Sequence, residues 1–356
     1  MTHSAALPMT EPAEPLLVAL CERGWLPDGL VRAGMRRLCA QRLRDEQAHE
    51  PEACDARLRA RVAQWSAGPL AVATREANLQ HYEVPPPFFE QVLGPHLKYS
   101  CALWQPETAT LADAERGMLE LTCERAQLRD GQRILELGCG WGSLTLWMAR
   151  TLPRAQIVAV SNSAPQREWI LRRAAERGLR NVEVITADVN DFRPQGAFDR
   201  VVSVEMFEHV RNHAELFRRI RGWLAPRGLL FAHVFCHRHA AYPFESEGPT
   251  DWMARHFFSG GMMPGYDLFL HYPRDLQIRQ RWWLSGEHYQ RTSEAWLANL
   301  DAHRTAVLEA LGGGATRAEA RLRVQRWRMF FMAVAELFGY DRGRQWGVGH
   351  YQFEAG

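Results

Sequence analysis

The fold is decided by residues 133–143, which read RILELGCGWGS. The apolar run 134–137 is typical of a buried parallel strand, and residues 144–150 continue with the spacing of a helix. Between them, glycines at every second position let the backbone turn sharply and let a ligand approach it closely. An ordinary strand-to-helix connection is the alternative for such a triplet taken alone.

Two features distinguish this turn from a dinucleotide-binding one. The pattern G-x-G-x-x-G ends in Gly or Ala, where this chain has Ser143, and an acid is expected about 20 residues further on. The next apolar run, 157–160, ends instead in the sequence SNS at 161–163. An acid, Glu136, precedes the glycines, where it can hold a cationic group.

The chain after the turn alternates apolar runs with helical segments. The predicted strands are 157–160, 182–185, 198–204 and 229–234, with helices at 166–178 and 216–224. This alternation indicates βαβ units and a parallel sheet, whose ligands bind at the carboxyl ends of the strands. The strand ends expected to meet in one crevice are 138–142, 161–163, Asp188, 205–209 and 233–237.

Composition places the chain among globular proteins of one large domain or two ordinary ones. It has 356 residues, of which 46% are hydrophobic and 24% charged, and a net charge of +2 gives no basic field for nucleic acid. Seven scattered cysteines without a C-x-x-C pair indicate neither zinc nor a disulfide framework, so we expect the reducing cytoplasm. No signal peptide and no integral membrane segment are expected, and the chain is expected to be a monomer or homodimer.

The flanking regions differ from this core. Residues 15–70 have a helical pattern, and 238–275 form an irregular segment rich in aromatic residues, Gly, Pro and Met, which is typical of a lid. Residues 278–289 are predicted as a strand, 295–311 and 317–338 as helices, and 346–353 as an edge strand. We therefore expect a helical N-terminal cap over 1–105 that contributes to the cofactor site, a Rossmann-like core over 106–237, and a lid insertion, helices and final strands over 238–356.

Acid/base chemistry is indicated directly after the strand at 198–204. Glu205, Glu208 and His209 place two carboxylates and an imidazole within five residues at the crevice mouth. If a helix begins here, Glu205 and His209 share a face, and Glu208 can orient the ring of His209. The alternative is the first turn of a helix with favourable acids. Its coincidence with the glycine turn and Asp188 favours a functional role.

Longer motifs make the sequence similar to the S-adenosylmethionine (SAM)-dependent methyltransferases of the cyclopropane fatty acid synthase superfamily. The matching segments include HYE, LGPHLKYSCALW, ILELGCGWGSL, VSNSAPQ and FDRVVSVEMFEHV. HVFCH, DWMARHFFSGGMMPG, WWLSGEHYQRTSEAWL and WRMFFMAVAELFGY resemble the coclaurine N-methyltransferase branch rather than the lipid-modifying branch. The resemblance implies an α/β class I methyltransferase fold, with about seven mostly parallel strands, an α-helical N-terminal cap and an inserted lid.

The resemblance also implies the cofactor and its contacts. SAM would be the methyl donor, S-adenosyl-L-homocysteine (SAH) the product, and no metal would be needed. Tyr82, Tyr99 and Ser100 would contact SAM from the cap, and Glu136, Gly138 and Gly140 would hold its methionine part. Asn162 and Gln166 would bind the ribose hydroxyls, and Asp188 with Val189 would contact the adenine.

By the same resemblance, the acceptor is the nitrogen of a small amine, such as a tetrahydroisoquinoline-like or arylalkyl amine. Amines are mostly protonated near neutral pH, so a base must remove the proton before the nitrogen attacks the methyl group. His209, with an ordinary pKa near 6.5, is the expected base, held by Glu208, while Glu205 attracts the ammonium form. Aromatic walls that stabilise a cationic nitrogen, or alternatively belong to the core, are Phe257, Trp283, Phe330 and Phe331.

Two alternatives stay open. The lipid branch transfers a methylene group to an unsaturated acyl chain with a bound bicarbonate as base, and Cys101, Glu208 and His233 match its binding positions. A tyrosine that this branch has in its C-terminal YYLNAC segment is phenylalanine here, within residues 328–332, which weakens that interpretation. A SAM-binding sensor without turnover is the other alternative. A His209→Ala variant that binds SAM but has lost turnover would support catalysis.

Overall fold

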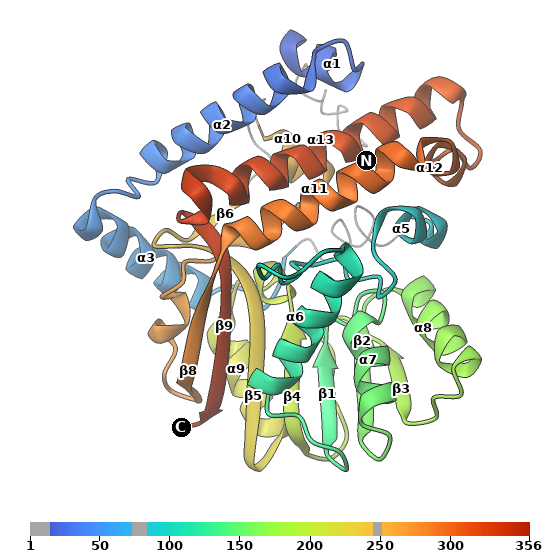
Figure 1. The fold of residues 1–356 in the computed structure, drawn as a ribbon. Helices are drawn as coiled ribbons and strands as arrows, with labels where there is room; N and C mark the ends of the chain where they lie inside the picture. Colours follow the sequence, from blue (N-terminus) through green and yellow to red (C-terminus); the bar gives the residue numbers. More distant parts are fainter. Residues whose placement is uncertain (1–14, 73–83, 245–250) are drawn as a thin grey trace, which may run out of the picture.

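A seven-stranded sheet forms the centre of the computed structural model, which describes residues 15–72, 84–244 and 251–356 (Figure 1). The strand order is β3-β2-β1-β4-β5-β9-β8. The strands are β1 Arg133–Leu137, β2 Gln156–Ser161, β3 Val182–Thr186, β4 Phe198–Val204, β5 Leu224–His237, β8 Leu276–Ser285 and β9 Trp346–Ala355. β1 to β5 pair in parallel, and β9 pairs antiparallel with both β5 and β8. The predicted class I methyltransferase sheet is confirmed.

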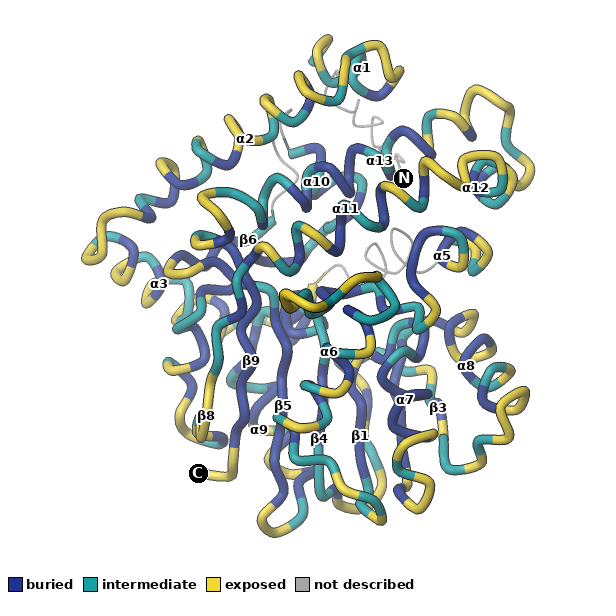
Figure 2. The backbone as a smooth tube through the Cα atoms, in the orientation of Figure 1, coloured by how far each residue is buried: buried dark blue, intermediate teal, exposed yellow. Residues whose placement is uncertain are grey.

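Both faces of the sheet are covered, because its strands are apolar on each side. On one face, α6 (Leu111–Arg125) and α7 (Ser143–Thr151) pack on residues such as Ile134. On the other, α9 (His213–Trp223) packs on residues such as Leu135. α8 (Ala164–Glu176) lies beside β3, and Figure 2 shows the strands of the sheet as largely buried.

β9 differs from its prediction as an edge strand. It lies between β5 and β8, and every residue from Trp346 to Phe353 is buried. Alternating polar residues suggested a solvent-facing side, but His350 and Gln352 face other parts of the protein and are buried there. The strand predicted at 278–289 ends at Ser285, where α11 begins.

Helices from the two ends of the chain pack together above the sheet (Figure 1). These are α1 Leu16–Glu22, α2 Asp28–Asp45, α5 Pro86–Val92, α11 Gly286–Ala302, α12 Arg304–Leu311 and α13 Arg317–Gly339, whereas α3 Pro51–Ser66 packs on α9. Arg32 of α2 binds Glu294 and Glu336, with N–O distances of 2.5 and 3.0 Å. The helical N-terminal cap is therefore fixed to C-terminal helices.

Between β5 and β8, the elements in the described residues 238–244 and 251–275 are short. They are β6 Tyr242–Pro243, α10 Trp252–His256, β7 Met262–Met263 and the 3₁₀ turn η2 Leu268–His271. The division into units 1–105, 106–237 and 238–356 stays a prediction. Across the part of the chain that the structure describes, no helix has the length and apolarity that crossing a bilayer requires.

Candidate active site

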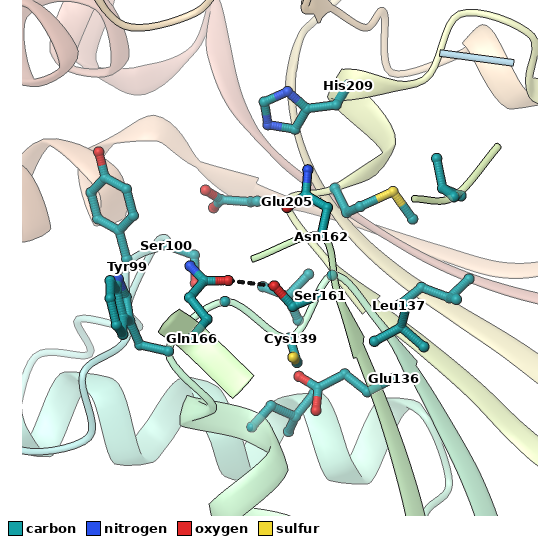
Figure 3. Close-up of a pocket in the computed structure, with 18 of the residues that line it drawn as sticks. Tyr99, Ser100, Glu136, Leu137, Cys139, Ser161, Asn162, Gln166, Glu205 and His209 are labelled. Carbon is teal, nitrogen blue, oxygen red and sulfur yellow. Dashed lines mark hydrogen bonds between the residues drawn. The ribbon is translucent and has the colours of Figure 1, made fainter. Parts of the chain in front are cut away.

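One cavity opens at the carboxyl ends of the parallel strands, where the sequence predicted a crevice. Its lining includes the glycine turn after β1, the SNS segment after β2, Asp188 after β3, and Glu205 and His209 after β4. Figure 3 shows Gln166, Ser161 and Asn162 between Glu136 and His209. The end of β5 does not line the cavity, although His233 reaches Glu205 from behind.

Backbone conformation shapes the floor of the cavity at the glycine turn. Gly138 has φ +78°, and a Cβ on it would lie 2.7 Å from the side chain of Met206. Gly140 has φ +51°, and a Cβ there would meet open space in the cavity. The N–H groups of Gly138 and Cys139 both donate to Val160 O at 3.0 Å, which ties the turn to β2.

Glu136 lies beneath this turn and lines the cavity. It is buried, and the Thr145 hydroxyl donates to its Oε2 at 2.5 Å. Burial raises the pKa of Glu136 to about 8, with the Thr145 hydrogen bond acting in the opposite direction. A cationic group beside the carboxyl would favour its ionised form. The site therefore suits an ammonium group.

Gln166 supplies an unpartnered donor in the middle of the cavity. Its Oε1 accepts from the Ser161 hydroxyl at 2.7 Å, so the buried Nε2 is the group that can donate to a ligand. This Nε2 has no hydrogen-bond partner within the described ranges. Asn162 lies next to it, and Asp188 and Val189 line the far end. This arrangement fits the ribose hydroxyls and adenine of a nucleoside.

Tyr99 and Ser100 enter the cavity from the loop after α5. The loop is held by the buried Glu115 of α6, whose carboxylate accepts from the N–H groups of Gly94, His96 and Lys98 at 2.9–3.3 Å. Lys98 is itself buried, lines the cavity and donates from Nζ to Ser100 Oγ. Tyr82, the third residue expected from the cap, lies outside the described residues.

Glu205 is the most heavily hydrogen-bonded side chain of the cavity wall. Its Oε1 accepts from Cys101 N–H at 2.9 Å and lies 3.1 Å from His233 Nε2. The Tyr289 hydroxyl donates to Oε2 at 2.6 Å. Burial raises the pKa of Glu205, whereas Lys98, Tyr289 and Cys101 lower it. Glu205 also has φ +49°, so its backbone is held in the left-handed region.

The helix considered for Glu205–His209, which would place the two side chains on one face, does not form. Only a 3₁₀ turn, η1 Phe207–His209, follows β4. Glu208 Oε1 accepts from Phe235 N–H at 2.7 Å, and Oε2 is buried without a hydrogen-bond partner in the described part of the chain. The tighter turn thus directs Glu208 to the β5 backbone, and the expected hold of Glu208 on the His209 ring is not observed.

His209 lines the cavity and is neutral at neutral pH. Burial lowers its pKa to about 4, against a raising effect of Glu205. The Phe258 ring lies over its imidazole, with centroids 4.7 Å apart and planes at 30°. Phe235 and Phe244 pack against Phe258 in turn. An aromatic wall therefore adjoins the imidazole.

The four aromatic residues proposed as substrate walls do not line this cavity. Phe257 stacks on Phe330 with centroids 4.5 Å apart, and Phe331 packs against Trp327. Trp283 lies on β8, packed against Tyr266. Their contact with a substrate stays a prediction.

The positions matched to a bicarbonate site are used differently here. Cys101 N–H and the His233 ring both bind Glu205, so a carboxylate of the chain itself occupies their donors. The phenol of this cluster comes from Tyr289 of α11, not from residues 328–332. Among described residues, no cluster of three His, Cys, Asp or Glu could hold a metal.

The fold and cavity together define a class I SAM-dependent methyltransferase. The sequence matches the mycolic acid cyclopropane synthetase family over residues 72–341, and the chain belongs to that family. It is 39% identical over 291 residues to (S)-coclaurine N-methyltransferase of Thalictrum flavum subsp. glaucum, covering 80% of this chain and 81% of that one. The enzyme of the same name from Papaver somniferum is 33% identical, covering 96% and 98%.

Solved structures agree. A crystal structure of coclaurine N-methyltransferase bound to N-methylheliamine and SAH matches with a TM-score of 0.91 and 34% identity, covering 95% of this chain and 98% of that one. The cyclopropane synthase MmaA2 from Mycobacterium tuberculosis shares the fold, with a TM-score of 0.68 and 24% identity, covering 81% of this chain and all of that one.

Sequence reasoning missed several residues of the cavity wall and its support. Lys98 precedes Tyr99 and Ser100, and its place in LKYS was an available signal. Tyr289 lies on the buried face of α11, where a tyrosine hydroxyl usually needs a partner. His350 and Arg125 offered no such signal; His350 Nε2 lies 2.9 Å from His233 Nδ1 and Arg125 Nη1 lies 2.8 Å from His350 Nδ1, contacts that only the folded sheet creates.

Proposed function

We propose that the protein transfers a methyl group from SAM to the nitrogen of a small amine bound between Glu205 and His209. The observation that carries this proposal is the Glu205 carboxylate. An ionised carboxylate has about four acceptor positions, and three donors already bind this one. The remaining position, on Oε2, is suited to the N–H of an ammonium group.

The cofactor-binding residues fit SAM in this proposal. Glu136 and the turn at Gly138 and Gly140 would hold the methionine part, and Gln166 Nε2 would donate to a ribose hydroxyl. The full set would be Tyr82, Tyr99, Ser100, Glu136, Gly138, Gly140, Asn162, Gln166, Asp188 and Val189. When bound, SAM supplies an electrophilic methyl group on its sulfonium, which is released to the nucleophile with SAH as the product.

The acid/base residues prepare the nitrogen. Glu205 attracts the ammonium form, and the neutral His209 accepts its proton, so that the nitrogen regains its lone pair. Because burial disfavours the imidazolium, the ionised Glu205 beside it must stabilise that charge. The proton passes from nitrogen to the ring first; the neutral nitrogen then attacks the methyl carbon, and the carbon–sulfur bond breaks as the carbon–nitrogen bond forms. Glu208 supports the turn that carries His209.

An arylalkyl or tetrahydroisoquinoline-like amine is the proposed substrate class. Support comes from the names of the relatives and from the aromatic wall of Phe258 and its neighbours beside His209. Methylene transfer to a lipid is less favoured, because Glu205 takes the donors that a bicarbonate would need. We also propose a cytoplasmic location, in keeping with seven free cysteines. The proposed reaction needs no metal, and we propose that the protein is a monomer or a homodimer.

The direct test incubates the protein with SAM and two panels, cyclic and arylalkyl amines on one side and monounsaturated phospholipids on the other. Mass spectrometry would read the gain of one methyl group on an amine, or of one methylene on a lipid. We expect methylated amine and unchanged lipid. Modified lipid with unchanged amines would contradict the proposal, and calorimetric SAM binding with neither product would favour a sensor.

A further inference from the structure

A chain of three side chains joins Glu205 to the last residue of α6. Arg125, the last residue of α6, places Nη1 2.8 Å from His350 Nδ1. His350 Nε2 lies 2.9 Å from His233 Nδ1, and His233 Nε2 lies 3.1 Å from Glu205 Oε1. Both histidines are fully buried. The two rings meet because His233 of β5 and His350 of β9 are directly opposed in the antiparallel ladder.

The direction of each hydrogen bond follows from chemistry alone. A guanidinium has only donors, so His350 Nδ1 must accept from Arg125. A neutral His350 then carries its proton on Nε2 and donates to His233 Nδ1. A neutral His233 in turn carries its proton on Nε2 and donates to Glu205. Burial holds the pKa of both rings well below 6.5, so both are neutral at neutral pH.

We propose that Arg125, His350 and His233 are positioning residues that fix one tautomer in each ring and thereby hold Glu205 as a carboxylate aimed into the cavity. The chain of bonds cannot export a proton, because Arg125 has no acceptor to receive one from His350. It acts instead through polarisation, since a charged donor at one end strengthens each following bond. This inference rests on the proposed function for its effect on turnover, but not for the tautomers themselves.

Other groups also face Glu205. Lys98 and Cys101 face it from the loop after α5, Tyr289 from α11, and His209 and Glu208 from η1. Lys98 also acts electrostatically on His233 and His350, where its charge lowers the pKa of both rings. A change at His350 or Arg125 perturbs Glu205 through the hydrogen-bonded chain Arg125–His350–His233, which we call the relay, while the donors from Cys101 and Tyr289 stay in place.

The first test reads the tautomers in ligand-free protein. Long-range ¹H–¹⁵N correlation spectra should show a protonated Nε2 and an unprotonated Nδ1 for both rings at neutral pH, with His350→Gln used for assignment. A protonated Nδ1 on either ring would overturn the proposal. This measurement needs no substrate, so its result stands even if no amine is methylated.

The second test measures the pH dependence of amine methylation. His350→Leu removes the donor to His233, so the acidic limb of kcat/KM should move upward by about one pH unit as Glu205 becomes easier to protonate. His350→Gln keeps a donor near the position of Nε2 and should restore the wild-type limb. SAM affinity, measured by calorimetry, should stay within twofold in both. An unmoved limb in a folded His350→Leu protein would overturn the proposal.

Arg125 offers a matched pair if His350→Leu fails to fold. Arg125 stacks on Trp282, with its guanidinium carbon 4.7 Å from the ring centroid, and Arg238 stacks on the neighbouring Trp283 at 4.9 Å. Of these two arginines, Arg125 contacts His350 and Arg238 does not. Arg125→Met should shift the acidic limb in the same direction, and Arg238→Met should not. Equal shifts in the two variants would show a merely structural effect and reject the relay.

Discussion

The two ends of the cavity are built in different ways. The proposed cofactor end uses mainly backbone turns and side chains at the ends of β1, β2 and β3, which are local in sequence, together with Tyr99 and Ser100 from the loop after α5. The acceptor end uses Glu205, whose donors come from residues 101, 233 and 289 and whose support reaches residues 125 and 350. A ligand site made from one supersecondary unit can thus be recognised in a sequence, whereas one made by tertiary packing cannot.

The largest effect that separates the two ends is expected from Glu205→Gln. The variant keeps the shape but loses the charge that attracts the ammonium and stabilises imidazolium, so kcat should fall about 10²- to 10³-fold. SAM affinity should stay within twofold, since no cofactor group is removed. Steady-state kinetics and calorimetry measure both.

Glu208→Gln is the matched control. A glutamine oxygen still accepts from Phe235 N–H, so kcat should fall less than tenfold. Equal losses in the two variants would instead assign Glu208 a charged role in turnover.

A smaller effect is expected from acid, which acts on the support of the acceptor end. His213 is fully buried beneath η1, with Nε2 3.0 Å from Phe207 O, and burial lowers its pKa to about 4. The unfolded chain takes up a proton below pH 6.5, but the folded ring does not until about pH 4. The contribution of His213 to the free energy of unfolding therefore falls as pH drops through this window, by about 2 kcal/mol at pH 5.

Denaturant unfolding between pH 7 and pH 5 measures this loss. His213→Asn removes the titrating group, so its free energy of unfolding should depend less on pH than that of the wild type, whatever its stability at pH 7. Parallel curves for the two proteins would contradict the assignment to His213.

The smallest effect is expected at the cofactor end, from Gly140→Ala. The left-handed φ of +51° makes alanine cost about 1 kcal/mol of stability, and its methyl group enters the cavity, so SAM affinity should fall about tenfold. Gly131→Ala is the control, because Gly131 also has a positive φ, +86°, and open space, but does not line the cavity. It should lose similar stability and no affinity; an equal loss of affinity would place the effect in the backbone alone.

Most of the fold and the cofactor end could be predicted from the sequence. The glycine turn, the strand ends and the helical cap follow from local periodicity and backbone chemistry. A helix that begins at Glu205 does not form: Glu205 has a left-handed φ, and a 3₁₀ turn follows it. β9 was predicted as an edge strand from its period of two, whereas its alternate residues His350 and Gln352 are buried and bind groups inside the protein. Strand order and long-range partners leave no mark on local spacing.

The left-handed backbone of Glu205 has a chemical consequence. Glycine is the residue that adopts this conformation without strain, and glycine here would leave the donors of Cys101, His233 and Tyr289 around an empty space of carboxylate size. The present chain fills that space with an anion tethered to its own backbone. Because this anion is covalently attached, it stays in place at any ion concentration and is not exchanged for chloride or phosphate from solution.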